Sequence, residues 1–186
     1  MPYMDLGLQR KQEIEDQLLL LMQDMPYDRI SVKDLTEKLQ IARKTFYHYF
    51  HNKQACLESL MDRMILESNL SLLSLPEHAS PEEQYAALLQ FWICNRGFLE
   101  ALGRNGLDTL FVRRILLYIR RDDSSIPFRL GSSFQTCDED MLYYCVSGHV
   151  CLMLKWCREG FSRPPEEMTQ IIIRLSRGLS VCMGLE

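Results

Sequence analysis

Side chains that can reach both phosphate oxygens and base edges are concentrated in one short stretch, residues 31–53, with the sequence SVKDLTEKLQIARKTFYHYFHNK. Its second half mixes cations, hydroxyls and aromatic rings, which can contact the DNA backbone and the bases within a groove together. The side chains concerned are Arg43, Lys44, Thr45, Tyr47, His48 and Tyr49. Double-stranded DNA is therefore the leading ligand hypothesis.

The local charge of this stretch also favours an anionic ligand. From Arg29 to Lys53 there are six lysines and arginines and two acids, a balance of +4, whereas the whole chain has a formal charge of −4. The alternative interpretation is a solvated face at one end of an ordinary helical domain. Because the positive charge coincides with the hydroxyls and aromatics, we favour the DNA interpretation.

Two short helices joined by a turn are needed to position these groups. Ser31 is placed to cap the first helix, and Asp34 can complete a capping box with it. Asn52 is placed to cap a later helix that begins at Lys53. Apolar residues at helical spacing are expected to form a small core beneath these helices: Val32, Leu35, Leu39, Ile41, Phe46 and Phe50.

Residues 31–53 resemble the DNA-binding end of TetR-family transcriptional regulators. In that family a helix started by Thr or Ser and a turn precede a short helix that ends in Thr-Leu-Tyr-x-x-Phe and is followed by Lys. The corresponding run here is TFYHYFHNK, residues 45–53. The match extends back to an amphipathic first helix that contains Ile14, Leu18, Leu21 and Met22.

By position, the resemblance implies a role for individual side chains in binding DNA. Those expected to contact base edges are Lys33, Arg43 and Lys44. Those expected to contact phosphates are Ser31, Thr45, Tyr47, Tyr49 and Lys53, and His48 is expected beside the DNA backbone.

Two positions depart from the family pattern. Gln40 stands where the turn usually has glycine, and Ala42 stands where the second helix usually begins with a small hydroxyl residue. Gln40 either adopts a less strained turn or takes a positive φ at a cost of about 1 kcal/mol. Both departures leave the exact start of the second helix open.

Length and composition predict a folded chain larger than one DNA-binding head. The chain has 186 residues, of which 47% are hydrophobic and 25% charged, enough for a proper core in one larger domain or two modest ones. Seven cysteines are an odd number, and no secretory leader is recognisable, so we expect a reducing cytoplasm. The apolar runs are too short to span a bilayer, so no membrane anchor is expected.

The rest of the chain is expected to be helical. This gives an all-α fold with an N-terminal three-helix helix-turn-helix head, residues 1–52, and a C-terminal helical body for ligand binding and dimerisation, residues 53–186. Residues 121–140 are expected to form a loop with a short helical piece. Apolar spacing and Pro or Gly boundaries predict helices over 53–68, from Pro81 through Phe98, and over 106–120, 138–159 and 165–184.

The resemblance implies a homodimer through the last two helices, which commonly form a four-helix interface in TetR-like proteins. A single short recognition helix contacts few base pairs, whereas two separated by about one DNA turn, roughly 34 Å, read a palindrome. We therefore expect a repressor that occupies a palindromic operator as a homodimer. Release by a small-molecule effector is the mechanism that the resemblance implies.

An apolar effector cavity and a simple packed core explain the body's aromatic residues equally well. The aromatic candidates are Trp92, Phe98, Phe111, Tyr118, Phe128, Phe134, Tyr143 and Tyr144. The candidate polar contacts are Asn95, Arg96, Arg104 and His149, and the sequence does not select among them. The ligand-binding residues are therefore left unassigned.

Other classes of function are less well supported. Cys145 and His149 lie one helical turn apart, with Cys151 and Cys157 nearby, but buried structural cysteines explain this spacing better than a metal or redox site. The sequence contains no Gly-rich phosphate loop, no Gly-x-Ser-x-Gly elbow and no His-Glu-x-x-His helix, so we expect neither an enzyme nor a cofactor. The main alternative is a TetR-like adaptor that binds a partner protein through its body, with DNA binding secondary or lost.

Overall fold

In the computed structural model, residues 6–120 and 139–182 are described, with side chains described as far as Ser176. In these two ranges the chain forms nine α-helices, one short 3-10 helix and no strand, which confirms the predicted all-α class. The N-terminal elements are α1 (Leu6–Asp24), η1 (Tyr27–Arg29), α2 (Val32–Lys38), α3 (Arg43–Tyr49) and α4 (Lys53–Leu73). The body contains α5 (Pro81–Cys94), α6 (Arg96–Arg104), α7 (Asp108–Ile119), α9 (Glu139–Arg158) and α10 (Pro165–Cys182).

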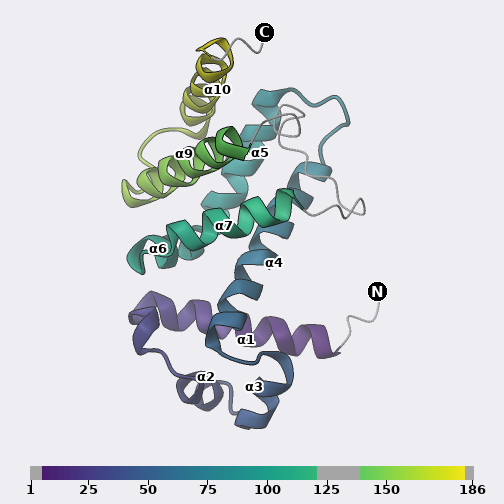
Figure 1. Ribbon diagram of the computed structural model, residues 1–186, viewed down its shortest axis with the longest axis vertical. Helices are drawn as coiled ribbons and strands as arrows, with labels where there is room; N and C mark the ends of the chain where they lie inside the picture. Colours follow the sequence, from purple (N-terminus) through teal and green to yellow (C-terminus); the bar gives the residue numbers. More distant parts are fainter. Residues whose placement is uncertain (1–5, 121–138, 183–186) are drawn as a thin grey trace.

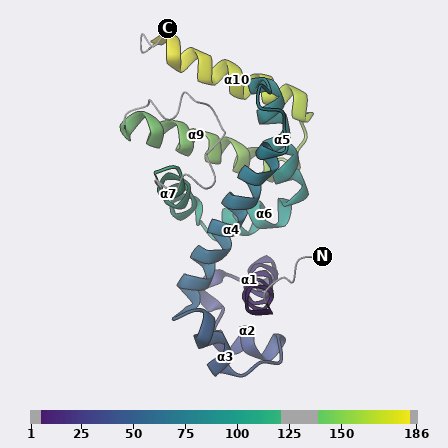
Figure 2. The same cartoon turned by 90° about the vertical axis from the view of Figure 1, so that its right-hand side faces the viewer.

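The long helix α4 connects the two ends of the molecule (Figures 1 and 2). It packs against α1 in the head and against α5 and α7 in the body. It continues beyond the predicted end near residue 68 because Leu72 extends its buried stripe. One apolar core runs from Ile14 in α1, along α4, to Cys157 in α9. The division of the chain at residues 52 and 53 stays a prediction.

A second apolar cluster fixes α10 in the part of the body far from the head (Figure 2). α10 packs against α5, and the indole of Trp156 in α9 is 1% exposed beneath it. The indole N–H donates to the Arg163 carbonyl oxygen at 3.2 Å, so the ring and the turn before α10 are held together. The positions of α9 and α10 agree closely with the predicted 138–159 and 165–184.

The prediction of one helix from Pro81 through Phe98 is wrong, because the chain leaves the helical conformation at Asn95. This residue has φ −105° and ψ 29°, and its side-chain amide donates to the Phe91 carbonyl oxygen at 2.9 Å. An asparagine side chain that competes for backbone groups in this way favours a helix end. α6 therefore begins in a new direction.

The loop with a short helical piece expected over 121–140 lies outside the described residues up to position 138. Within the described ranges, no helix combines the length and the apolar character needed to cross a membrane.

Candidate DNA-binding site

The first helix of the candidate site begins with the predicted capping box. The Asp34 backbone N–H donates to the Ser31 hydroxyl at 3.2 Å, and the Asp34 carboxylate accepts from the Ser31 backbone N–H at 2.8 Å. The Ser31 hydroxyl also donates to this carboxylate at 2.7 Å. These bonds, from the Ser31 hydroxyl first and its N–H second, hold the pKa of Asp34 below its usual value.

The turn between α2 and α3 takes the strained one of the two conformations considered for Gln40. Its φ is +53°, in the left-handed region where glycine is usual. The Gln40 N–H donates to the Glu37 carbonyl oxygen at 3.2 Å, and the Ile41 N–H donates to the Thr36 carbonyl oxygen at 3.0 Å. This pair of bonds is a Schellman motif, which satisfies the last carbonyls of α2. Ala42 then precedes α3 without a side-chain cap.

The recognition candidate α3 has one buried face and one cationic face. Phe46 and Phe50 are 0% and 3% exposed, so they anchor the helix in the core as predicted. Arg43 and Lys44 are exposed, and no ion pair engages either of them among the described residues. The exposed ring of Tyr47 stands edge-on against Phe46, with ring centroids 5.4 Å apart. Phe46 thus contacts one side of the Tyr47 ring, while the rest of that side chain is exposed.

The other predicted DNA-contacting residues of the two short helices surround this face. His48 is exposed, and its ring packs edge-on against the half-buried Tyr49 with centroids 4.9 Å apart. Thr45 is half-buried. Lys33 in α2 is exposed and lies 3.6 Å from the Glu37 carboxylate.

Lys53 has a structural role that the sequence did not predict. Its ammonium group donates to the carbonyl oxygens of Tyr27 and Ile30, at 2.6 and 2.7 Å. It also lies 4.0 Å from the centroid of the Tyr27 ring. Burial lowers the pKa of Lys53. These two bonds use two of the three ammonium N–H groups, so a phosphate contact by Lys53 stays a prediction.

Tyr27 is itself held to the body, so Lys53 connects the start of α4 to a fixed point. The Tyr27 backbone N–H donates to the Asn105 side-chain oxygen at 2.6 Å. Burial raises the pKa of the Tyr27 hydroxyl to about 12, so it stays neutral. No sequence pattern indicates the contact between the Lys53 ammonium and the Tyr27 carbonyl, because the two residues are 26 positions apart.

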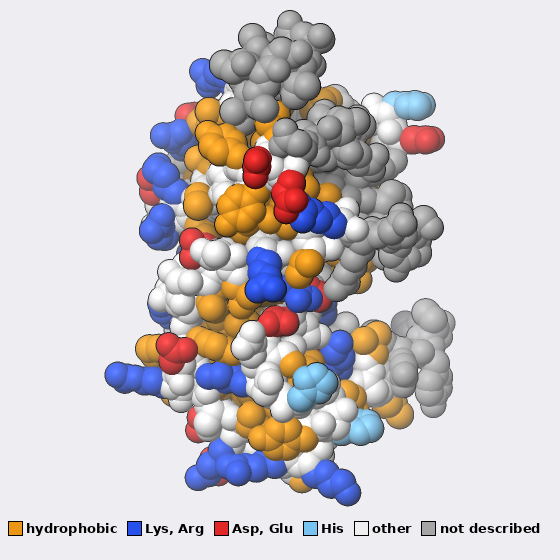
Figure 3. Space-filling view, viewed as in Figure 1, with side chains coloured by type: hydrophobic (Ala, Val, Ile, Leu, Met, Phe, Trp, Pro, Cys, Tyr) orange, Lys and Arg blue, Asp and Glu red, His pale blue; other side chains and the backbone are white. Residues whose placement is uncertain are grey.

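Lysine and arginine side chains gather at the end of the molecule where α2 and α3 lie (Figure 3). Arg43, Lys44 and Lys33 extend from these two helices, and the capping box and the Schellman motif fix the helix ends that carry them. The site thus presents a preformed cationic surface with hydroxyl and aromatic groups between the charges. Such a surface can make ion pairs and hydrogen bonds to phosphates and reach base edges.

Buried charges connect this head to the rest of the molecule. Glu15 in α1 is 2% exposed, and its carboxylate accepts from Arg63 of α4 at 2.6 Å and from Ser59 at 2.7 Å. Arg63 also pairs with Asp16. Partners this far apart in sequence give no local pattern from which the contact could be predicted.

A comparable contact joins α4 to α7 in the body. The Arg114 guanidinium donates to Asp62 at 2.9 Å, and it lies 3.4 Å from the Glu58 carboxylate. α4 is therefore held by ion pairs on both sides, to α1 below and to α7 above (Figure 1).

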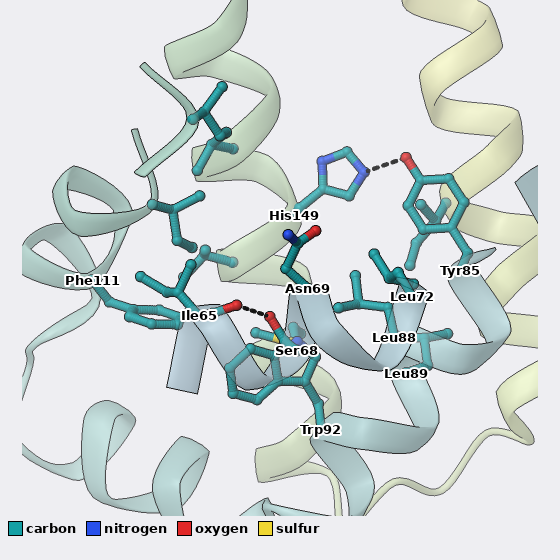
Figure 4. A pocket seen from close by; sticks show the side chains of 16 residues that line it. Ile65, Ser68, Asn69, Leu72, Tyr85, Leu88, Leu89, Trp92, Phe111 and His149 are labelled. Carbon is teal, nitrogen blue, oxygen red and sulfur yellow. Dashed lines mark hydrogen bonds between the residues drawn. The ribbon is translucent and has the colours of Figure 1, made fainter. Parts of the chain in front are cut away.

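Candidate residues in the body separate into four groups. Trp92, Phe111 and His149 line a cavity between α4, α5, α7, α9 and α10 (Figure 4), whereas Tyr143 and Tyr144 are exposed on α9. Phe128 and Phe134 lie outside the described residues. The others do not line the cavity: Phe98, Tyr118, Asn95, Arg96 and Arg104.

The cysteine and histidine residues of α9 do not assemble a metal site. His149 Nδ1 lies 2.6 Å from the backbone carbonyl oxygen of Cys145. Cys145 and Cys157 are buried, and Cys151 is exposed. Among the described residues there is no cluster of three His, Cys, Asp or Glu side chains that could hold a metal ion.

Residues 18–60 match the family model of bacterial regulatory proteins of the tetR family. The chain is also 38% identical over 64 residues to the HTH-type transcriptional regulator EthR of Mycobacterium tuberculosis and of Mycobacterium bovis. That match covers 34% of this chain and 30% of the length of those relatives.

Three solved structures share the fold over most of the chain. A tetR-family transcriptional regulator from Streptomyces coelicolor is 17% identical, with a TM-score of 0.59, over 96% of this chain and 83% of its own. The fatty acid degradation regulator FadR from Bacillus halodurans is 14% identical, with a TM-score of 0.58, over 89% and 93%. The dihydroxyacetone kinase operon activator DhaS is 18% identical, with a TM-score of 0.55, over 89% and 93%.

Proposed function

We propose that this chain is a DNA-binding transcriptional regulator of the TetR family, and that it is a repressor which occupies a palindromic operator as a homodimer and is released by a small-molecule effector. The observation that carries the proposal is the exposed cationic face of α3. Arg43 and Lys44 are exposed without an ion pair among the described residues, and the Tyr47 ring is 54% exposed beside them.

In this proposal some side chains of α3 contact base edges and others contact phosphates. Arg43 and Lys44 contact base edges in the major groove, where a guanidinium or an ammonium pairs well with guanine O6 and N7. Tyr47 donates its hydroxyl proton to a phosphate oxygen, and Phe46 holds its ring in place. Thr45, His48 and Tyr49 complete the contact with the backbone.

Ser31, Lys33 and Lys53 contribute from outside α3. Lys33 reaches a base edge from the start of α2, because its weak pair with Glu37 is exposed at both ends and a DNA contact can replace it. Ser31 and Lys53 contact phosphates while they also stabilise the head through the capping box and the two carbonyl contacts.

The exposed surface of α9 and α10 supports a homodimer through these helices. A groove of about 630 Å³ lies between them. Tyr144 and Leu175 line it and are 63% and 56% exposed, and Gly148 beside them is open enough to accept a close neighbour. Large apolar side chains gathered in this way favour a protein interface. A two-fold arrangement would give two α3 helices for one palindrome.

The experiment that tests the proposal is selection of binding fragments from the source genome with the purified protein at moderate salt. We expect the wild type to enrich a palindrome, and Tyr47→Ala to lose that enrichment while its thermal unfolding is unchanged. Tyr47→Phe is the matched control for the ring, since it removes only the hydroxyl. If the wild type enriches no sequence, the proposal fails and the partner-binding adaptor becomes the better account.

A further inference from the structure

The body contacts the DNA-binding head at a second place besides α4, where α6 lies against the end of α1 that leads to η1 and α2 (Figure 1). A Cβ atom on Gly97 of α6 would lie 2.5 Å from the Gln23 side-chain nitrogen, so the two helices approach closely there. At the other end of α6, the Arg104 guanidinium donates to the Gln23 carbonyl oxygen. That carbonyl is in the last turn of α1, where helical partners are lacking and a cation is favourable.

Asn105 adds a bond to the segment that follows α1. Its side-chain oxygen accepts from the Tyr27 backbone N–H at 2.6 Å, and its side-chain N–H donates to the Ala101 carbonyl oxygen at 2.7 Å. A backbone N–H can only donate and a carbonyl oxygen can only accept, so these two partners fix which way the amide points. Asn105 is half-buried, and Gly106 follows it with a φ of +61° at the end of α6. The amide is therefore held by its own helix in the orientation that the Tyr27 N–H needs.

The contact at Tyr27 lies beside both ends of the helix-turn-helix unit, residues 31–52. Tyr27 and Ile30 come just before the unit, and their carbonyl oxygens accept from the ammonium group of Lys53, which comes just after it. One cluster of bonds thus holds the chain on both sides of the two short helices. Through Asn105, the end of α6 is bonded to that cluster.

α6 is itself packed against α9, one of the two helices of the proposed dimer interface. Leu102 of α6 belongs to the same buried cluster as Val150 and Leu154 of α9. Long helices curve, so α4 alone leaves the angle between the head and the body open. The end of α6 supplies a second attachment, which relates the head to α9.

We propose that Arg104 and Asn105 are positioning residues, which set the angle of the DNA-binding head and thereby the spacing of the half-sites that the homodimer accepts. In a two-fold dimer a change of this angle moves both α3 helices, whereas a palindrome presents its half-sites at one spacing. Heads that leave the matching orientation part of the time bind with an affinity reduced in proportion. The inference rests on the proposed function, because it needs a homodimer on a palindrome.

The test compares operators that differ in the spacing of their half-sites. The palindrome selected by the wild type is used unchanged and with one inserted base pair, which moves the half-sites about 3.4 Å apart and turns them by about 35°. Anisotropy measures the affinity of the full chain for both duplexes. We expect insertion to cost the wild type about tenfold or more in affinity, and Arg104→Met/Asn105→Ala less than about threefold, because its heads can follow the half-sites. On the unchanged palindrome this variant should bind about fivefold more weakly than the wild type.

The same two residue types stand at the start of α6 and provide a matched control. Asn95 is half-buried and Arg96 is exposed, as in the pair at the other end, and their side chains bond within the body. Asn95→Ala/Arg96→Met should therefore keep the spacing preference of the wild type. An equal change of spacing preference in the two double variants would overturn the assignment.

A duplex with a single half-site separates positioning from damage to the head. One half-site contacts one α3 helix, so Arg104→Met/Asn105→Ala should bind it within about twofold of the wild type. Equal losses on the half-site and on the palindrome would overturn the proposal, because the two residues would then support only the fold of the head. Hydrogen exchange of the Tyr27 N–H should be faster in this variant, and an unchanged exchange rate would overturn the contact on which the proposal depends.

Arg104→Met alone keeps the test decisive if the double variant does not melt cooperatively, since Arg104 is exposed. It removes the bond to the Gln23 carbonyl oxygen and should lower the discrimination between the two spacings at least about twofold. Unchanged discrimination in folded Arg104→Met would overturn the role of Arg104.

Failure of this inference can be distinguished from failure of the proposed function. A wild type that binds a palindrome, with the same spacing preference in Arg104→Met/Asn105→Ala, overturns the inference alone. A wild type that enriches no palindrome overturns the proposed function, and with it this role of Arg104 and Asn105.

Discussion

The head exposes its candidate DNA-binding side chains on helices of seven residues, whereas the cavity of the body lies between helices of up to 21 residues. Seven residues are too few for a stable isolated helix, so α2 and α3 depend on caps, a Schellman turn and a few anchoring rings. The long helices of the body depend on buried apolar volume instead. Substitutions of exposed residues in the head should therefore mainly lower DNA affinity, whereas substitutions of buried residues in the body should mainly lower stability.

The double variant Arg43→Ala/Lys44→Ala should give the largest effect, confined to DNA binding. Each base-edge contact is worth about 1–3 kcal/mol, so operator affinity should fall by about 2–6 kcal/mol and sequence preference should relax. Stability should change by less than about 0.5 kcal/mol, because both side chains are exposed. Fluorescence anisotropy and urea unfolding measure the two quantities. Lys38→Ala, on an exposed position of α2, is the control. Equal losses of operator affinity in Lys38→Ala and in the double variant would contradict specific contacts by α3.

Phe111→Ala should reverse this pattern by lowering stability without removing a DNA contact. The ring is fully buried and lies against Phe98 and Trp92, with centroid distances of 5.3 and 5.8 Å. Truncation of such a ring costs about 3–5 kcal/mol. Urea unfolding should show this loss, while operator affinity of the folded protein stays within about twofold. A large loss of affinity with unchanged stability would contradict the separation of the two regions.

Arg63→Met should destabilise the contact between α1 and α4, because it leaves the Glu15 carboxylate buried without its cation. Removing one partner of a buried pair costs about 3 kcal/mol or more. Arg10→Met is the matched control, since its pair with Glu13 is exposed on both sides and should cost less than about 1 kcal/mol. Thermal unfolding that shows equal losses for the two variants would mean that burial of Glu15 does not matter.

The loss of a helix cap should have the smallest effect on stability, and two capping boxes allow this loss to be compared between the head and the body. Ser31 caps α2 in the head and Ser80 caps α5 in the body, each with a carboxylate three residues later. Ser31→Ala and Ser80→Ala should each cost about 1 kcal/mol of stability. Only Ser31→Ala should also weaken operator binding, as anisotropy would measure. Equal operator affinity in the two variants would disconnect the α2 cap from recognition.

The capping box of Ser31 and Asp34 also predicts that the stability of the Ser31→Ala variant depends on pH differently from that of the wild type. The bonds from Ser31 lower the pKa of Asp34, so this carboxylate stabilises the fold above its unfolded pKa and loses that contribution as pH falls through the lowered folded pKa. Ser31→Ala protein should therefore lose less stability on acidification than wild type. Unfolding midpoints measured from neutral to acid pH would contradict this cause if the two proteins changed in parallel.

The head could be predicted from sequence because its determinants are local. The cap at Ser31, the cap at Asn52 and the anchors Phe46 and Phe50 each depend on neighbours within a few residues. The conformation of Gln40 was left open, since a turn residue's φ depends on the strain that the surrounding helices can impose. The Lys53 contact was missed because its two carbonyl partners lie more than 20 residues earlier.

The body was predicted at the level of its helices but not of its site. Trp92, Phe111 and His149 were among the candidates, yet nothing local separates them from core residues such as Phe98. Tyr85, whose hydroxyl lies 3.4 Å from His149 Nε2, was not among the candidate ligand contacts, because the two residues are 64 positions apart. A cavity assembled from five helices requires the tertiary structure, whereas a recognition helix can be identified from its own residues.

The central claim is that two copies of the exposed face of α3 read one operator, and binding of the selected fragment to the wild type and to Tyr47→Ala tests it most directly. Anisotropy and sedimentation on that duplex should show two wild-type chains per palindrome, with affinity reduced at least about tenfold in Tyr47→Ala and restored little by Tyr47→Phe. One chain per duplex, or equal affinity of wild type and Tyr47→Ala, would contradict the account.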